Sequence, residues 1–187
     1  MRLTEKSTLS TVALTVGDAL RGSGIHGVLT GGACVSLYTR GPYHSTGVDF
    51  VLSGVVHRDE LDEALATVGF QRSGDRYDHP TTLLYVEFPP GPLAIGGDLE
   101  IKPVEIRRAR LRTLALSATD CCRDRLAAYY HWNDRQSLRA AVLVALVNRM
   151  QIRRIEEWSR GEGAGSRFEE FREELKQARN RRRRAGR

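Results

Sequence analysis

The spacing of apolar residues changes along the chain and predicts alternating helices and strands in its first two thirds. Over residues 3–21 the apolar positions recur every three or four residues, as on one face of a helix, and glycines at 22 and 24 end that pattern. Apolar runs rich in β-branched and aromatic residues predict strands at 25–29, 48–52 and 82–88. The remaining predictions here are helices at 33–38 and 58–68 and strands at 70–72, 99–101, 104–106 and 112–116.

The residues after 117 are predicted to form helices only. Ser117 or Thr119 is a suitable N-cap for a helix that continues to Trp132, and the polar residues 133–136 interrupt or bend it. Further helices are predicted at 138–150, 152–158 and 167–177. This order of elements is typical of an α/β (α+β) fold, with a mixed sheet flanked by helices and a helical C-terminal part.

The length of 187 residues and the hydrophobic content of 41% suffice for one core with a small appendage. We predict a core at 1–133, a helical extension at 134–175 and a basic, disordered tail at 176–187. No apolar run reaches the roughly 18 residues of a membrane span, and the N-terminus lacks a signal-peptide pattern, so we expect a cytoplasmic protein without membrane contact. The apolar stretch 138–158 suits either a packed appendage or a homo-oligomer interface.

The positive charge of the chain is concentrated at its C-terminus. Residues 176–187 (KQARNRRRRAGR) carry seven of the 29 basic side chains and no acid, so the rest of the chain has 22 basic and 23 acidic side chains. A segment of this kind can hold RNA through its phosphates, or a protein acceptor, without reading sequence. It is also typical of a solvated, disordered end.

The residues best suited to chemistry surround the turn between the first predicted strand and the helix after it. Gly31 and Gly32 occupy this turn, where glycines allow a ligand to approach and the free N–H groups of a helix start attract anions. Asp49 lies on the next predicted strand, and Glu87 lies on a later one. Carboxylates that face such a turn can hold a metal ion bound to phosphate oxygens. The pattern therefore predicts a site for a phosphate-bearing ligand.

Three segments in this order carry a family resemblance: LTGGACVSLYTRGPYHSTGVDFV, YVEFPPGPLAIG and TDCCRDRLAAYYHWNDRQSL. They resemble a bacterial and archaeal group of uncharacterised nucleotidyltransferase-like proteins within the polymerase-beta-type nucleotidyltransferase superfamily, over most of residues 25–160. The resemblance implies a fold in which a glycine turn holds the phosphates of a nucleoside triphosphate and three carboxylates hold two Mg²⁺ ions. The implied reaction moves a nucleoside monophosphate to an acceptor hydroxyl.

Carried onto this sequence, the resemblance implies a role for five residues. Gly31, Gly32 and Ser45 would bind the nucleotide, and Asp49 would be a catalytic metal ligand. Glu87 would be a second metal ligand, or would orient or deprotonate the acceptor hydroxyl.

The chain departs from the family's pattern at one position. The family's first Asp falls at 47, where this sequence has Gly47. Asp98, Glu100 or His44 could replace it. Because that Asp helps to bind both metals in the family, the departure puts the transfer reaction in doubt.

A second group of polar residues lies on and just after the predicted helix that ends at 132. We predict Asp124, His131, Asp134 and Arg135 as substrate-binding residues that line the cleft. The alternative is a buried polar network that docks the C-terminal helices onto the sheet. Arg125 and His131 also resemble the Arg-His spacing of a helical ribonuclease family that often accompanies nucleotidyltransferases.

Three functions are therefore open, and the sequence does not decide whether the protein is an enzyme. The first is an Mg²⁺-dependent nucleotidyltransferase. The second, which Gly47 favours, is a catalytically inactive module of the same fold that binds a nucleotide, RNA or the partner of a toxin–antitoxin pair. The third is an RNase that uses Arg125 and His131.

Overall fold

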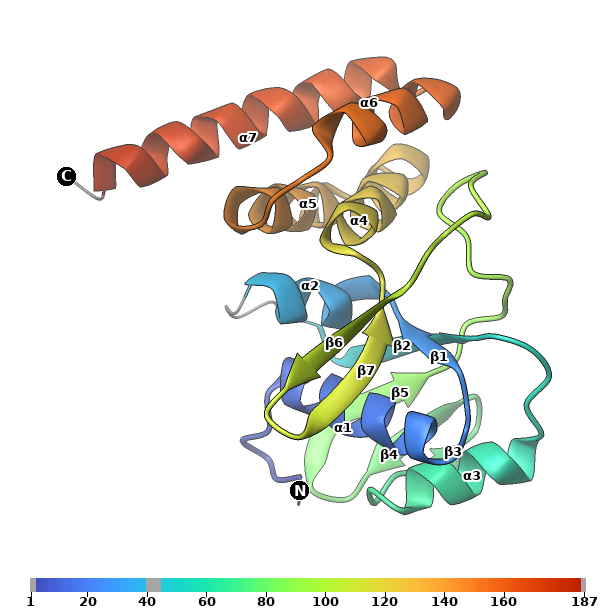
Figure 1. Ribbon diagram of the computed structural model, residues 1–187. Helices are drawn as coiled ribbons and strands as arrows, with labels where there is room; N and C mark the ends of the chain where they lie inside the picture. Colours follow the sequence, from blue (N-terminus) through green and yellow to red (C-terminus); the bar gives the residue numbers. More distant parts are fainter. Residues whose placement is uncertain (1–2, 40–44, 186–187) are drawn as a thin grey trace.

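The computed structural model describes residues 3–39 and 45–185. Within these residues seven strands form one sheet with the order β3-β4-β5-β2-β1-β7-β6 (Figure 1). The strands are β1 (Gly27–Leu29), β2 (Gly47–Leu52), β3 (Gln71–Ser73), β4 (Arg76–His79), β5 (Thr82–Glu87), β6 (Val104–Arg108) and β7 (Leu111–Ala115).

Helices cover the sheet on one side and stack in two further layers beyond it. Figure 1 shows α1 and α3 beside the sheet, α4 and α5 together above α2, and α6 and α7 as the outermost layer. The described helices are α1 (Leu9–Gly22), α2 (Gly31–Thr39), α3 (Arg58–Ala66), α4 (Ala118–Trp132), α5 (Arg135–Val147), α6 (Ile152–Gly161) and α7 (Gly165–Ala185).

The sheet is mixed, because its central strands have one neighbour of each direction. Strand β1 runs antiparallel to β2 and parallel to β7, and β2 runs parallel to β5. The structure therefore confirms the predicted α+β class with a mixed sheet and a helical C-terminal part.

One face of the β4-β5-β2 region packs against α3, and the other carries the polar residues of interest. Tyr77 is the register partner of Val86, and its hydroxyl donates a hydrogen bond of 2.5 Å to Asp62 of α3. Because side chains alternate along a strand, Glu87 points to the opposite face. Asp49 is the register partner of Glu87 and shares that face.

Two predicted elements differ in the structure. The first helix begins at Leu9 rather than at residue 3, because Thr8 is its N-cap and accepts a hydrogen bond from the backbone of Thr11 at 3.2 Å. Residues 99–101 form no strand, and the backbone pairs there only through an isolated bridge between Ile95 and Asp98.

The predicted disordered tail is wrong for residues 176–185, which belong to α7. The sequence from 166 to 185 has no proline or glycine, and Arg, Glu, Lys, Gln and Ala are good helix formers. Phe171 and Leu175 are buried, so the turns of α7 before residue 176 pack against the rest of the protein. Within this part of α7, Arg182 donates a hydrogen bond to the carbonyl of Leu146 near the end of α5.

The predicted break after Trp132 is present. Asn133 adopts a left-handed conformation with φ 53°, and Asp134 then caps α5. The boundaries of the predicted core and extension remain predictions. Among the helices described, none combines the length and the apolar character that a membrane span requires.

The connection between β5 and β6 is anchored to the C-terminal helices. The guanidinium of Arg123 on α4 is buried and donates to Asp98 at 2.5 Å and to Asp120 at 2.8 Å. The indole of Trp158 on α6 donates to the carbonyl of Ile95 at 3.2 Å. These contacts join the connection that follows the strand with Glu87 to α4 and α6.

Candidate functional site

The turn between β1 and α2 brings Gly31 against Asp49. Gly31 has φ 64°, a conformation that favours glycine, and a Cβ built on it would lie 2.3 Å from Oδ2 of Asp49. The backbone N–H of Thr30 donates to the carbonyl of Asp49 at 2.9 Å, which holds the two strand ends together. Gly31 and Gly32 are both buried. The carboxylate of Asp49 therefore lies at the N-terminus of α2.

Asp49 and Glu87 are directly paired on neighbouring parallel strands. Strands in a sheet are about 4.8 Å apart, so the two carboxylates leave the sheet side by side on one face. Burial first, and then the negative charge of Glu87, raise the pKa of Asp49 to about 6. The pair therefore favours a cation, a proton or a hydrogen-bond donor as its partner.

Helix α4 places a second pair of charges beside Asp49. Arg125 donates two hydrogen bonds to Asp124, at 3.0 and 2.7 Å, and both side chains are about four-fifths buried. The charge of Arg125 lowers the pKa of Asp49, whereas that of Asp124 raises it. The structure thus brings the predicted residue Asp124 to the Asp49 site together with Arg125, a guanidinium that was predicted only for an RNase.

Gly47, where the family's first Asp would stand, is covered by Tyr85. Gly47 and Tyr85 are register partners, and a Cβ on Gly47 would lie 3.1 Å from the ring and 3.3 Å from the hydroxyl. The guanidinium of Arg76 lies over the same ring, 4.6 Å from its centroid, and Arg76 is the register partner of Glu87. An aromatic ring and a guanidinium therefore occupy this part of the site.

Tyr85 and Arg76 are at this site and are not among the residues predicted for it from the sequence. A signal for Tyr85 was available, because it precedes Glu87 by two residues on one strand and so shares its face. Arg76 gave no such signal, because its position depends on the pairing of β4 with β5.

The donor set does not fit the pair of Mg²⁺ ions that the resemblance implies. Two carboxylates, Asp49 and Glu87, are aligned, and Gly47 supplies no third oxygen. Across 3–39 and 45–185 no group of three or more His, Cys, Asp and Glu residues is arranged to hold a metal ion. Hard cations are held well by several converging oxygens, which this face lacks.

Two of the three residues that could have replaced the missing Asp have other surroundings. Asp98 is bound to Arg123, and this interaction lowers the pKa of Asp98. Glu100 is exposed, and its backbone N–H donates to the Asp98 carboxylate. His44 lies outside the described residues.

Ser45, predicted to bind the nucleotide, lies at the entrance to β2. Its hydroxyl donates to the carbonyl of Gly47 at 3.1 Å. The hydroxyl thus stabilises the start of the strand below Tyr85. Its predicted contact with a ligand remains a prediction.

Asp134 and Arg135 have structural partners away from Asp49. Asp134 accepts hydrogen bonds from the backbone of Gln136 and Ser137, and the Ser137 hydroxyl lowers the pKa of Asp134 most. Arg135 pairs with Glu170 of α7 at 2.9 Å. These contacts match the alternative in which polar residues dock the C-terminal helices.

His131 lies near the C-terminal end of α4, and its ring pairs with Glu162 at 3.4 Å. Arg125 and His131 are six residues apart, which puts them about 120° apart around the helix. The structure therefore places these two side chains on different sides of α4, with different partners.

Comparison with solved structures supports the fold. The chain is similar to the crystal structure of an antigenic nucleotidyltransferase-like protein from Paracoccidioides brasiliensis, with a TM-score of 0.58 and 19% identity over 75% of this chain and 77% of that one. At this identity the similarity concerns the fold, which is nucleotidyltransferase-like. No family model and no curated protein sequence matches the chain.

Proposed function

We propose that the protein binds a nucleotide at the Gly31–Asp49–Glu87 site and does not transfer a nucleoside monophosphate through a pair of metal ions. The observation that carries the proposal is the contact between Gly47 and Tyr85. Where the transfer reaction needs a carboxylate, this chain has no side chain, and a Cβ added there would lie 3.1 Å from the Tyr85 ring.

The charges around the site support the binding of a phosphate-bearing ligand without metal. The N-terminus of α2 provides N–H groups and the positive end of a helix dipole beside Asp49. The positive charge of Arg125 lowers the pKa of Asp49, and Arg76 is paired with Glu87 across β4 and β5. Guanidinium groups bind phosphate oxygens with two parallel hydrogen bonds. The two arginines lie among three carboxylates, those of Asp49, Glu87 and Asp124, and the raised pKa of Asp49 reduces the negative charge that a phosphate ligand would meet.

The test is ATP binding by isothermal titration calorimetry in excess EDTA. Wild type should bind ATP without added metal, and Arg76→Gln or Arg125→Gln should weaken binding by about tenfold, the loss of one charge-assisted hydrogen bond. Arg153→Gln on α6 is the control, since its side chain is 92% exposed, and it should leave the affinity unchanged.

The Asp49–Glu87 alignment is the one observation that favours metal-dependent transfer as a second candidate. With labelled triphosphates and Mg²⁺, labelling of an acceptor that Asp49→Ala abolishes would establish transfer and overturn the proposal. Absence of ATP binding in EDTA would overturn it as well. Arg125 and His131 are about 120° apart around α4 and have different partners, which gives no support to the RNase. A toxin–antitoxin partner, an RNA or protein acceptor held by residues 176–187, homo-oligomer formation and a cytoplasmic location remain predictions.

A further inference from the structure

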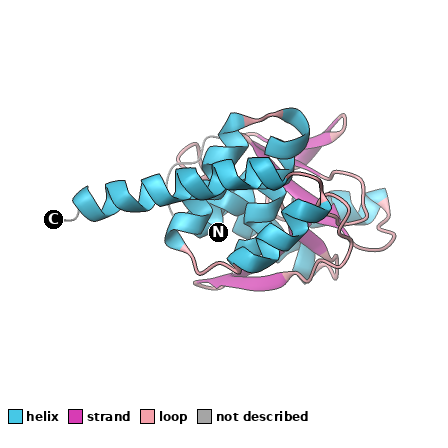
Figure 2. Cartoon of the chain, turned by 90° about the horizontal axis from the view of Figure 1, so that it is seen from above, coloured by secondary structure: helices cyan, strands magenta, loops and turns pink. Residues whose placement is uncertain are grey.

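The C-terminal half of α7 is a basic helix that projects from the body. In both views α7 lies along the outer helical layer, and its last turns extend past the neighbouring helices (Figures 1 and 2). Every residue from 179 to 185 is exposed. The segment carries five arginines and no acid.

The two halves of α7 differ in how their charges are satisfied. In the first half, Glu169 pairs with Arg172 at 3.1 Å and Glu173 pairs with Lys176 at 3.7 Å. In the second half, Arg182 donates to a backbone carbonyl. The other four arginines, at 179, 181, 183 and 184, have no acidic partner among the described residues. Their charge is available to a partner outside the chain.

These arginines surround the helix rather than forming one stripe. At 100° per residue, Arg179 and the run 181–184 leave no gap wider than about 100° around the axis. A protein groove would contact one side of such a helix and leave the charges on the other side unused. A ligand with negative charge on both sides of the helix would engage all of them.

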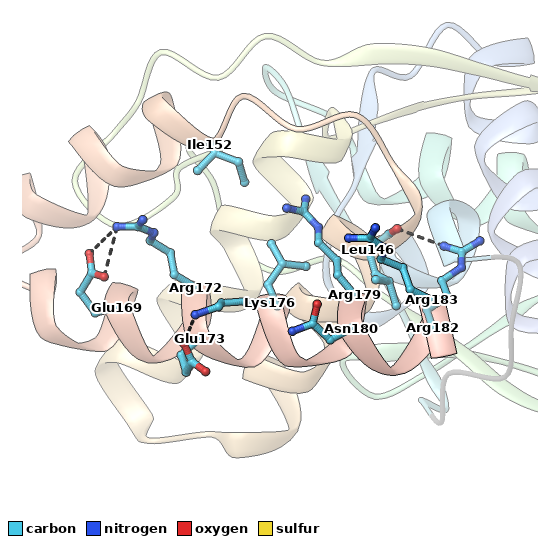
Figure 3. Close-up of a pocket in the computed structure, with 11 residues that line it drawn as sticks. Leu146, Ile152, Glu169, Arg172, Glu173, Lys176, Arg179, Asn180, Arg182 and Arg183 are labelled. Carbon is cyan, nitrogen blue, oxygen red and sulfur yellow. Dashed lines mark hydrogen bonds and ion pairs between the residues drawn. The ribbon is translucent and has the colours of Figure 1, made fainter. Parts of the chain in front are cut away.

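A groove beside α7 adds room for such a ligand. It has a volume of about 970 Å³ and is lined by Leu146 and Ile152, by the basic residues of α7 and by Glu169 and Glu173. Figure 3 shows Lys176, Arg179 and Arg183 along it. Glu169 and Glu173 are paired with Arg172 and Lys176, so the arginines beyond residue 178 supply the uncompensated charge of the groove.

We propose that the C-terminal half of α7 enters the major groove of double-stranded DNA and binds the phosphates of both strands without reading sequence. A helix with its side chains is about 10–12 Å wide, and the major groove of B-form DNA is about 12 Å wide. The major groove of an RNA duplex is deep and narrow, so it does not admit the helix in this way. Arginine is suited to phosphate because its planar guanidinium binds two oxygens at once.

The experiment measures the binding of a labelled DNA duplex of random sequence by fluorescence anisotropy at several salt concentrations. Arg179→Gln/Arg183→Gln removes charge on one side of α7, and Arg181→Gln/Arg184→Gln removes it on the other. Each double variant should reduce the slope of log K against log salt by about 1.8, because each phosphate contact contributes about 0.9. Circular dichroism should show unchanged helix content, since all four side chains are exposed.

A matched control removes the same charge elsewhere. Arg107→Gln/Arg153→Gln changes two exposed arginines outside α7 and should leave the slope within error of wild type. An equal loss in this control would show that net charge alone is responsible and would overturn the proposal.

Three further results would overturn it: no DNA binding by wild type, tighter binding of an RNA duplex at the same salt concentration, or an effect of the 179/183 pair alone, which indicates a one-sided partner such as an acidic helix in the groove. None of these variants touches the Asp49 site, so the outcome is independent of nucleotide binding.

Discussion

The ring of Tyr85 lies over Gly47, where a Cβ would come within 3.1 Å of it, because β2 and β5 are parallel and place these two residues opposite one another. An aspartate at position 47 would therefore meet the ring, which would have to shift. Tyr85→Ala alone removes the ring without adding a carboxylate, and Gly47→Asp alone adds a carboxylate against the ring.

The first prediction is that metal binding requires both positions to change. Gly47→Asp/Tyr85→Ala should bind Mn²⁺, a spectroscopic probe of Mg²⁺ sites, at least about tenfold more tightly than wild type, because three carboxylates hold a hard cation better than two. Electron paramagnetic resonance of free Mn²⁺ measures this. Tyr85→Ala alone is the control and should resemble wild type. Equally tight binding by wild type would show that Asp49 and Glu87 suffice.

The second prediction concerns the pH dependence that Asp49 confers. Its pKa is raised from 3.8 to about 6, so the folded state binds this proton more strongly than the unfolded state does. The contribution to stability is complete below about pH 4 and is lost as the pH rises through about 6. It amounts to at most about 3 kcal/mol, less where solvent reaches the carboxylate.

Asp49→Asn removes this titration and keeps the shape of the side chain. Its free energy of unfolding should exceed that of wild type at pH 7.5 and vary less between pH 4 and 7, as measured by urea denaturation. Asp75→Asn, at an exposed carboxylate in the turn between β3 and β4, is the control. Parallel pH curves for wild type and Asp49→Asn would contradict the prediction.

The third prediction separates a helix cap from a ligand contact at Asp134. Asp134→Ala should lower the free energy of unfolding by about 1 kcal/mol at pH 7, since the N-cap of α5 is lost. The pKa of Asp134 is lowered, so this contribution is present above the pKa of the unfolded state and disappears as the pH falls. Calorimetry should show that Asp134→Ala binds ATP with the same affinity as wild type. A weaker affinity with unchanged stability would restore its predicted role in the site.

The fourth prediction concerns the buried guanidinium of Arg123. Arg123→Met should destabilise the protein by about 3–5 kcal/mol, because Asp120 is 1% exposed and would lose its closest cation. Arg154 remains near Asp120 at 3.2 Å and limits the loss. Arg153→Met, an exposed pair with Glu157, should cost no more than about 0.5 kcal/mol. Urea denaturation of both variants decides, and equal losses would contradict the prediction.

The sequence predicted those features of the site that depend on local patterns. Gly31 and Gly32 follow an apolar run and precede a helix, and Asp49 and Glu87 lie on strands with clear β-propensity. The cover of Gly47 by Tyr85 was not predictable, because it depends on the register between strands 38 residues apart in the sequence. The position of Arg125 near Asp49 was not predictable for the same kind of reason, because it depends on how α4 packs against the sheet.

The cap at Asp134 has a local sign in the sequence, because Ser137 follows three positions later. The predicted contact of Asp134 with a ligand stays a prediction. Residues 176–185 were predicted as disordered from charge alone, whereas their helix propensity and the buried Leu175 before them favour the continuation of α7.

The contact between Gly31 and Asp49 has a consequence for the evolution of this chain. Any side chain at 31 would require both a left-handed backbone and the removal of the Asp49 carboxylate. The two positions can therefore change freely only in one order, with the acid replaced by a smaller residue first. Among homologous sequences, a residue other than glycine at 31 should occur only where 49 is no longer acidic, so the pair records whether the site has been abandoned.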